Sequence, residues 1–154
     1  MTNVAPRAEH FITGYEHSRD ALHTLATSVA AAPNWQEKYR QLMQAGKLLP
    51  AFEQIWQTED ARVRGCESAA WLWHYHQEGK HYFLADSDAR IVKGLIALLL
   101  AALNGHSGSE IAQFDAIQYF DSLGLGGQLS PSRTNGLYAL VTQIKTQANK
   151  EETP

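Results

Sequence analysis

The sequence predicts the α+β class, with helices packed around a small antiparallel sheet. Apolar residues recur at helical spacing over most of the chain, the pattern changes to strict alternation over 70–77, and turn residues then precede a second short run. With 154 residues the chain fits one domain, 1–154, large enough to bury about two-thirds of its unfolded surface. Its ends, 1–8 and 148–154, are expected to fray.

Two helices are predicted before the sheet. The first covers 9–31, where apolar residues recur loosely at helical spacing. The second starts at Asn34, because Glu37 three residues later is typical of a capping box, and Gly46 is a natural stop. The stretch 51–60 fits a short helix or a loop equally well.

A β-hairpin is predicted where the period changes. Its strands cover 70–77 and 81–85, and the Glu-Gly pair at 78–79 supplies a two-residue turn. This register sets Tyr75 opposite Tyr82 and gives the sheet one aromatic face that is suited to burial.

Helices are predicted again after the hairpin. The Asp-Ser-Asp segment at 86–88 is interpreted as the cap of a helix over 89–103, which is apolar nearly all round and should lie at the centre of the core. Further helices are expected over 109–113, 115–123 and 131–147. Ser130 caps the last of these, and Pro131 takes its first position.

Composition and charge limit the partners and the compartment. The net charge is −3 and there is no long basic run, so no nucleic acid or anionic membrane is expected as a partner. The N-terminus lacks a signal-peptide core, and the apolar segment 91–103 is too short to cross a bilayer. A single cysteine excludes an internal disulfide. These features predict a cytoplasmic protein in a reducing compartment.

The only cysteine, Cys66, lies in the stretch VRGCES, on a loop or at a strand end. A thiolate is the reactive form of cysteine, and Arg62 and Arg64 would favour it while Glu67 would oppose it. Gly65 beside it allows another backbone to approach closely. A free cysteine is also among the most buried residue types. The residues alone therefore leave a reactive site and a small buried apolar residue both open.

Three histidines form a second candidate site. His74 and His76 share one strand face, and the predicted register sets His81 across from His76. Three imidazoles can bind zinc, but no carboxylate or thiol falls at a convincing spacing to complete the set. The alternative is a solvated polar strand face.

Arg133 is the remaining candidate. It lies near the start of the last predicted helix, where a positive charge opposes the helix dipole. This position is a mild indication that the arginine has another purpose. The glycines of GLGGQL lack the strand and helix that flank a phosphate loop.

Four motifs give the chain a resemblance to a known family. NWQEKYRQLMQAGKLLP, RGCESAAWLW, DSDARIVKGLIALLLAAL and LSPSRTNGLYAL occur in the order seen in the SufE/CsdE family of sulfur-acceptor proteins. The resemblance runs from about 34 to 144. It implies an α+β fold related to that of the IscU scaffold proteins. In that fold the acceptor cysteine lies on a loop at one end of the sheet, with its sulfur in an apolar pocket until a partner draws it out.

The resemblance also implies a function. Members accept a sulfane sulfur from the persulfide of a pyridoxal-phosphate cysteine desulfurase, of the SufS or CsdA type, and stimulate that enzyme. They pass the sulfur on for iron–sulfur cluster assembly or related pathways. The acceptor matches Cys66. No cofactor of its own is expected, since the pyridoxal phosphate resides on the partner, and the chain is expected to be a monomer or a homodimer.

Four further residues receive roles on this basis. Gly65 is the candidate hinge of the cysteine loop, and Arg133 would aid thiolate formation or loop docking. Glu67 and Asp88 would contact the partner. The chain departs from the family at Ala70, where a larger residue is common, which bears on the choice of partner.

Two other functions compete with sulfur transfer. One is a metal- or cluster-binding scaffold that uses His74, His76, His81 and Cys66. The other is a regulator that activates a desulfurase by contact alone, in which case a Cys66→Ala variant would keep the activation.

Overall fold

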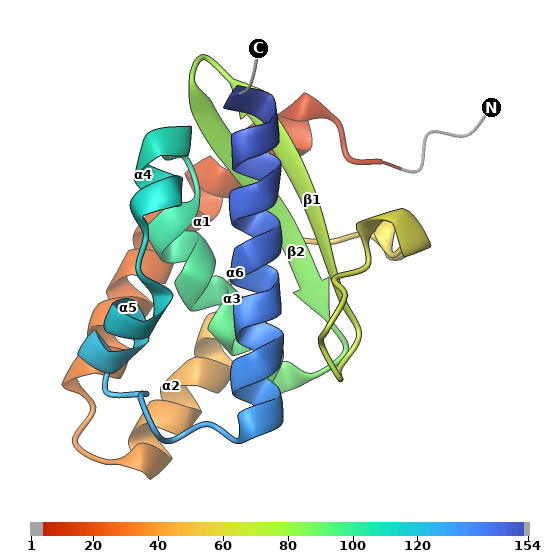
Figure 1. Ribbon diagram of the computed structural model, residues 1–154. Helices are drawn as coiled ribbons and strands as arrows, with labels where there is room; N and C mark the ends of the chain where they lie inside the picture. Colours follow the sequence, from red (N-terminus) through yellow and green to blue (C-terminus); the bar gives the residue numbers. More distant parts are fainter. Residues whose placement is uncertain (1–4, 153–154) are drawn as a thin grey trace.

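Helices cover both faces of a two-stranded antiparallel sheet in the computed structural model, which describes residues 5–152 (Figure 1). The elements are α1 (Ala8–Ala31), α2 (Trp35–Lys47), the 3₁₀ turns η1 (Gln54–Trp56) and η2 (Glu59–Ala61), β1 (Ala70–Gln77), β2 (Lys80–Ser87), α3 (Arg90–Leu103), α4 (Gly108–Gln113), α5 (Ala116–Ser122) and α6 (Pro131–Glu152). The predicted α+β class is confirmed. The stretch 51–60, for which the sequence allowed a short helix or a loop, contains the 3₁₀ turn η1 and the start of η2.

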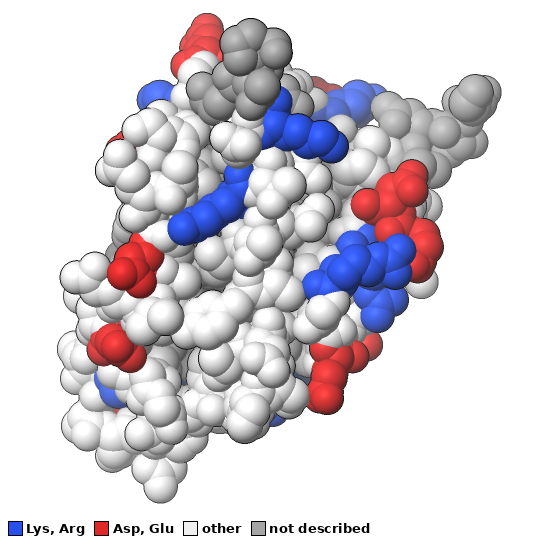
Figure 2. Space-filling view, viewed as in Figure 1, with Lys and Arg blue, Asp and Glu red and all other residues white. Residues whose placement is uncertain are grey.

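The surface seen in Figure 2 has an edge rich in charged side chains and a region that is largely uncharged. Basic and acidic side chains lie side by side at the edge where η1 and η2 emerge, whereas the surface over the N-terminal half of α6 is largely uncharged. Within residues 5–152, no helix combines the length and the apolar composition needed to cross a membrane.

The hairpin has the predicted register. Tyr75 pairs with Tyr82 and His76 with His81. Glu78 and Gly79 both adopt positive φ, at 53° and 76°, which matches the twist of the flanking strands. The second strand is longer than predicted, because it begins at residue 80 and continues to residue 87.

The prediction of a solvated polar face on the sheet is wrong. The aromatic face does pack, against Phe11 of α1 and Trp56 of η1. The opposite face is also covered, by α3 and α6, and there Phe83 and His81 are 0% exposed. With helices on both sides of two strands, the histidines lie on the side of the sheet that faces the main core.

The helices α2 and α3 cross closely because glycines occupy the contact. A Cβ on Gly94 would lie 2.9 Å from the carbonyl carbon of Leu42 and overlap its oxygen, and one on Gly46 would lie 3.1 Å from the Gly94 nitrogen. α3 is the central buried helix, as predicted, and its Ile96 and Leu99 are fully inaccessible to solvent. The main core therefore forms around α3, between the hairpin and α2.

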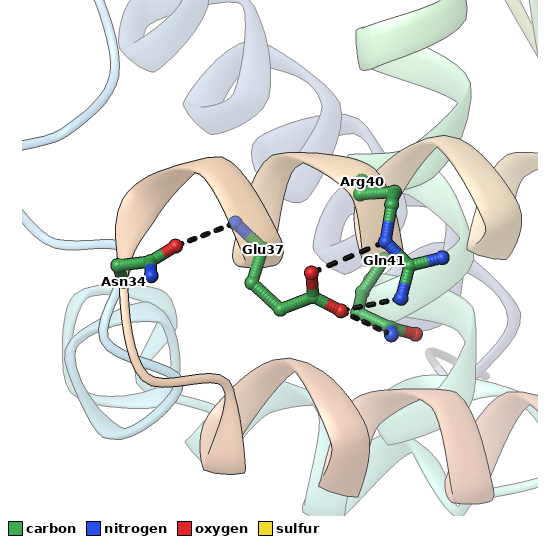
Figure 3. Close-up of polar contacts among 4 residues, drawn as sticks. All are labelled: Asn34, Glu37, Arg40 and Gln41. Carbon is green, nitrogen blue, oxygen red and sulfur yellow. Dashed lines mark hydrogen bonds and ion pairs between the residues drawn. The ribbon is translucent and has the colours of Figure 1, made fainter.

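The start of α2 follows the prediction in part (Figure 3). The side-chain oxygen of Asn34 accepts a hydrogen bond from the Glu37 backbone N–H at 2.9 Å, as an N-cap should. The Glu37 carboxylate turns instead toward Arg40 and Gln41, which donate to it from the next turn. The hydrogen bond from Arg40, followed by that from Gln41, lowers the pKa of Glu37.

The interpretation of 86–88 as a helix cap is mostly wrong. Asp86 and Ser87 belong to β2, and Asp86 pairs with Lys93 at 3.5 Å. Ala89 is the N-cap of α3, with no side-chain cap. Only the Ser87 hydroxyl acts near the helix start, where it accepts a hydrogen bond from the Ala89 N–H at 3.2 Å. The strand keeps pairing through these residues, and that pairing outweighs their preference for caps.

Both ends of the chain differ from the predicted tails. Ser130 caps α6 as expected, by accepting from the Arg133 N–H at 3.3 Å, but the helix runs past 147 to Glu152. Ala148, in the predicted tail 148–154, is 1% exposed in the core. At the other end α1 already begins at Ala8. Positions 1–4 and 153–154 of the predicted tails lie outside the described residues.

Candidate functional site

Cys66 lies on the loop that leads into β1, at the end of the hairpin opposite its tight turn. Gly65 before it has φ of +86°, a left-handed conformation that glycine adopts without a steric penalty. The loop therefore turns sharply just before the cysteine. The cysteine itself is half-buried.

The sulfur of Cys66 is seated on α6. A Cβ added to Gly136 would lie 2.9 Å from Cys66 Sγ, and one added to Gly65 would lie 3.3 Å from the Ala139 Cβ. Gly136 and Ala139 are one helical turn apart and so share a face. The cysteine loop thus rests on α6 at two consecutive turns, both of which carry small residues.

A cavity of about 390 Å³ adjoins the sulfur. Its apolar lining is contributed by Val63, Ala70, Val92, Leu95, Leu137 and Leu140. Its polar lining is contributed by Glu67, Ser68, Ser130, Ser132 and Arg133. The sulfur therefore lies between an apolar wall built by α3 and α6 and a polar rim built by its own loop and the first turn of α6.

The environment of Cys66 favours the protonated thiol. Burial raises its pKa, and the carboxylates of Asp88 and Glu67 act in the same direction. A hydrogen bond from the Ser68 backbone and the charge of Arg62 oppose this, but the net pKa is raised. Because the thiolate is the nucleophile, the cysteine is weakly reactive in this position.

The structure brings the predicted site residues together. Gly65 and Glu67 flank the cysteine, Arg133 lines the cavity from α6, and Asp88 lies close enough to act on the thiol. Arg62 supplies the positive charge predicted for the thiol. The side chain of Arg64 instead pairs with exposed Glu59 at 3.2 Å.

Gly136 is the site residue that the sequence reasoning missed. Its signal is a glycine in the interior of the last predicted helix, within the motif SRTNGL. Glycine is unfavourable in a helix interior by about 1 kcal/mol relative to alanine. Such a position suggests a close approach, and the structure shows that the partner is the cysteine sulfur.

The histidines form a separate group at the far end of the sheet. His74 Nε2 lies 2.7 Å from His81 Nδ1, and the His76 ring stacks on His81 with centroids 4.5 Å apart. Cys66 precedes β1, whereas His76 lies near the other end of that strand, about 20 Å from the strand's first residue, Ala70, at about 3.3 Å per residue. Within residues 5–152, no three or more His, Cys, Asp or Glu side chains are arranged to hold a metal ion. The described structure therefore does not bring His74, His76, His81 and Cys66 together as the metal- or cluster-binding scaffold would require.

The histidine group predicts acid sensitivity. Burial, followed by the charges of His81 and His76, lowers the pKa of His74 from 6.5 to about 4. Between pH 6.5 and about pH 4 this residue binds more protons in the unfolded chain than in the folded protein. The free energy of unfolding therefore falls as the pH falls through this range. We expect a loss of about 2 kcal/mol from this ring, below the full shift because solvent screens it in part.

Urea unfolding across this pH range, followed by circular dichroism, tests the expectation. A His74→Gln variant is the control, because it keeps a hydrogen-bonding group at this position but does not titrate. Its stability should depend less steeply on pH than that of the wild type. Parallel curves for the two proteins would show that His74 does not carry the effect.

Comparison with known proteins identifies the family. The model of the family "SufE: Fe-S metabolism associated domain" matches residues 23–148. The chain is 42% identical over 122 residues to the sulfur acceptor protein CsdE of Escherichia coli (strain K12), covering 79% of this chain and 83% of that protein. It is 35% identical over 133 residues to an uncharacterised SufE-like protein of Rhizobium meliloti (strain 1021), covering 83% and 94%.

A solved structure supports the fold. The solution structure of a hypothetical protein from Thermus thermophilus superposes with a TM-score of 0.69 at 21% identity, covering 86% of this chain and 96% of that one. The family match spans most of the chain, and it includes the cysteine loop, the hairpin, α3 and the cysteine-facing part of α6. The chain belongs to the SufE family.

Proposed function

We propose that this protein is a sulfur acceptor that takes a persulfide sulfur onto Cys66 from a pyridoxal-phosphate cysteine desulfurase. The observation that carries the proposal is the seating of the only cysteine, with its sulfur on α6 beside a cavity of about 390 Å³. Membership of the SufE family and the similarity to a protein named as a sulfur acceptor support the same reaction.

The transfer is a thiol exchange. The Cys66 thiolate attacks the terminal sulfur of the donor's persulfide, a new sulfur–sulfur bond forms, and the bond inside the donor persulfide breaks. The donor cysteine leaves as a thiolate, so no external oxidant or reductant is needed. The rate depends on the thiolate fraction of the attacking cysteine and on its access to the donor sulfur.

The inward position of the sulfur suits storage of the product. A persulfide is easily reduced by small thiols, and an apolar wall beside it limits their approach. Attack on a donor requires the opposite, an exposed thiolate. We therefore expect Cys66 to be inward at rest and to move outward at the donor, with Gly65 as the hinge.

The surrounding residues complete the proposal. Arg133 on the cavity wall would favour the thiolate or dock the loop, and Glu67 and Asp88 would contact the desulfurase. The pyridoxal phosphate belongs to that partner and not to this chain. The protein would stimulate the desulfurase and pass the sulfur to an acceptor for iron–sulfur cluster assembly or a related pathway, in the cytoplasm, as a monomer or a homodimer.

Intact mass spectrometry tests the proposal directly. Wild-type protein and Cys66→Ser are incubated with a SufS- or CsdA-type desulfurase and free cysteine, without thiol reductant. The wild type alone should gain the mass of one sulfur atom, and a reductant should remove it. Cys66→Ser is expected to gain no sulfur at all, because the chain has no other thiol.

Desulfurase turnover measured in the same samples distinguishes sulfur acceptance from activation of the desulfurase by contact alone. If Cys66→Ser stimulates the enzyme as strongly as the wild type and neither protein gains sulfur, the chain is a regulator that acts by contact, and sulfur acceptance is refuted.

A further inference from the structure

The cysteine loop is pinned at both ends. On one side the Val63 N–H donates a hydrogen bond to the Ala70 carbonyl at 2.9 Å. On the other side the Ala69 carbonyl accepts from the Asp88 N–H at 3.1 Å and from the Ser87 hydroxyl at 2.6 Å. The segment 64–68 between these anchors can therefore change its position without unpairing the hairpin.

The inner position of that segment depends on two small residues of α6. The space that a Gly136 side chain would take lies 2.9 Å from Cys66 Sγ, a separation at which a methyl group and a sulfur atom overlap. One turn further along, the space that a Gly65 side chain would take lies 3.3 Å from the Ala139 Cβ. The loop thus lies against one face of α6 at two places, its sulfur beside Gly136 and its hinge beside Ala139.

We propose that Gly136 and Ala139 are positioning residues, and that their small size sets how much of the time Cys66 is held inward. Larger side chains at these positions would displace segment 64–68 outward while the anchors and α6 remain in place. The role of these residues in sulfur transfer rests on the proposed function. The geometry of the loop and the test below concern only the position and reactivity of the Cys66 thiol.

Outward displacement changes the chemistry of the thiol in a defined direction. Burial is the largest cause of the raised pKa of Cys66. Removing that burial brings the pKa down toward its ordinary value, so more thiolate is present at neutral pH and alkylation becomes faster. Alanine favours the helical state over glycine, so Gly136→Ala is expected to keep α6 intact.

The test is the rate at which iodoacetamide alkylates Cys66, measured from about pH 6 to about pH 10. The variants are Gly136→Ala and Ala139→Val, with Thr146→Ala as a matched control at an exposed position of the same helix. We expect a rate about tenfold higher at pH 7 for both variants, because a less buried thiol has a lower pKa and a larger thiolate fraction. The midpoint of the pH profile should move to lower pH, while the control matches the wild type.

A merely structural role would change the melting temperature but leave this profile in place. If the folded variants, verified by circular dichroism, match Thr146→Ala in both rate and midpoint, the proposal is overturned. Should Gly136→Ala not fold, Ala139→Val decides the question, because it adds bulk under Gly65 without touching the sulfur seat. Alkylation needs no donor, so its outcome stands apart from the outcome of the sulfur-loading experiment.

Discussion

Replacing Gly94 by alanine is expected to lower the free energy of unfolding by about 3 kcal/mol. The new methyl group would lie 2.9 Å from the carbonyl carbon of Leu42 and overlap its oxygen. That neighbour is the backbone of a packed helix, so relief requires moving α2 away from α3. Val92 and Leu95, which line the cavity beside Cys66, flank Gly94 on α3, so any part of the relief taken up by α3 would shift the cavity wall. Sulfur acceptance is therefore expected to weaken together with stability.

The comparison variant is Gly46→Ala, on the other side of the same crossing. Its methyl group would lie 3.1 Å from the Gly94 nitrogen and from the Lys93 Cβ, a strain that small adjustments can partly relieve. Because alanine also favours the helix by about 1 kcal/mol over glycine, the net loss should be about 1 kcal/mol. Urea unfolding of both variants gives the ranking. Equal losses would mean that the Leu42 carbonyl does not set the distance between the helices.

Truncation of Ile96 to alanine is expected to cost about 4 kcal/mol, because it leaves a cavity at the centre of the core. The side chain is 0% exposed on the central helix, where neighbours on every side are fixed by their own packing. Ile117→Ala removes the same atoms from a side chain that is 60% exposed, and it should change stability by no more than about 0.5 kcal/mol. Denaturant midpoints for the pair measure the difference. A loss in Ile117→Ala comparable with that in Ile96→Ala would show that the exposed isoleucine is buried in solution, by an unrecognised contact.

The parts of the fold that follow from local patterns could be predicted from the sequence. The register of the hairpin follows from the alternation in each strand and from a turn that requires positive φ at Glu78 and Gly79. The central position of α3 follows from a helix that is apolar nearly all round. Cys66 and the residues beside it could be named as a candidate site because the chain has only one cysteine. The motifs around it also match a family.

The parts that depend on distant contacts could not be predicted. The solvent exposure of the histidine face of the sheet depends on where α3 and α6 pack. The sequence of the strand alone does not determine this. The polar neighbours of Ala148 indicate a frayed tail, yet this residue is buried in the core. The sequence marks Gly136 as unusual inside a helix, but it does not reveal what lies against it, because the sulfur of Cys66 is seventy residues away in the chain.

The two anchors of segment 64–68 define a tether with a fixed reach. Cys66 is three residues from Val63 and three from Ala69, and a chain spans at most about 3.5 Å per residue. The α-carbon of Cys66 therefore travels no more than about 10 Å from the end of the hairpin. A donor sulfur that lies deeper than this beneath the surface of its own enzyme stays out of range. A donor with such a buried sulfur would have to carry its persulfide on a movable segment or admit the end of the hairpin into its active-site entrance.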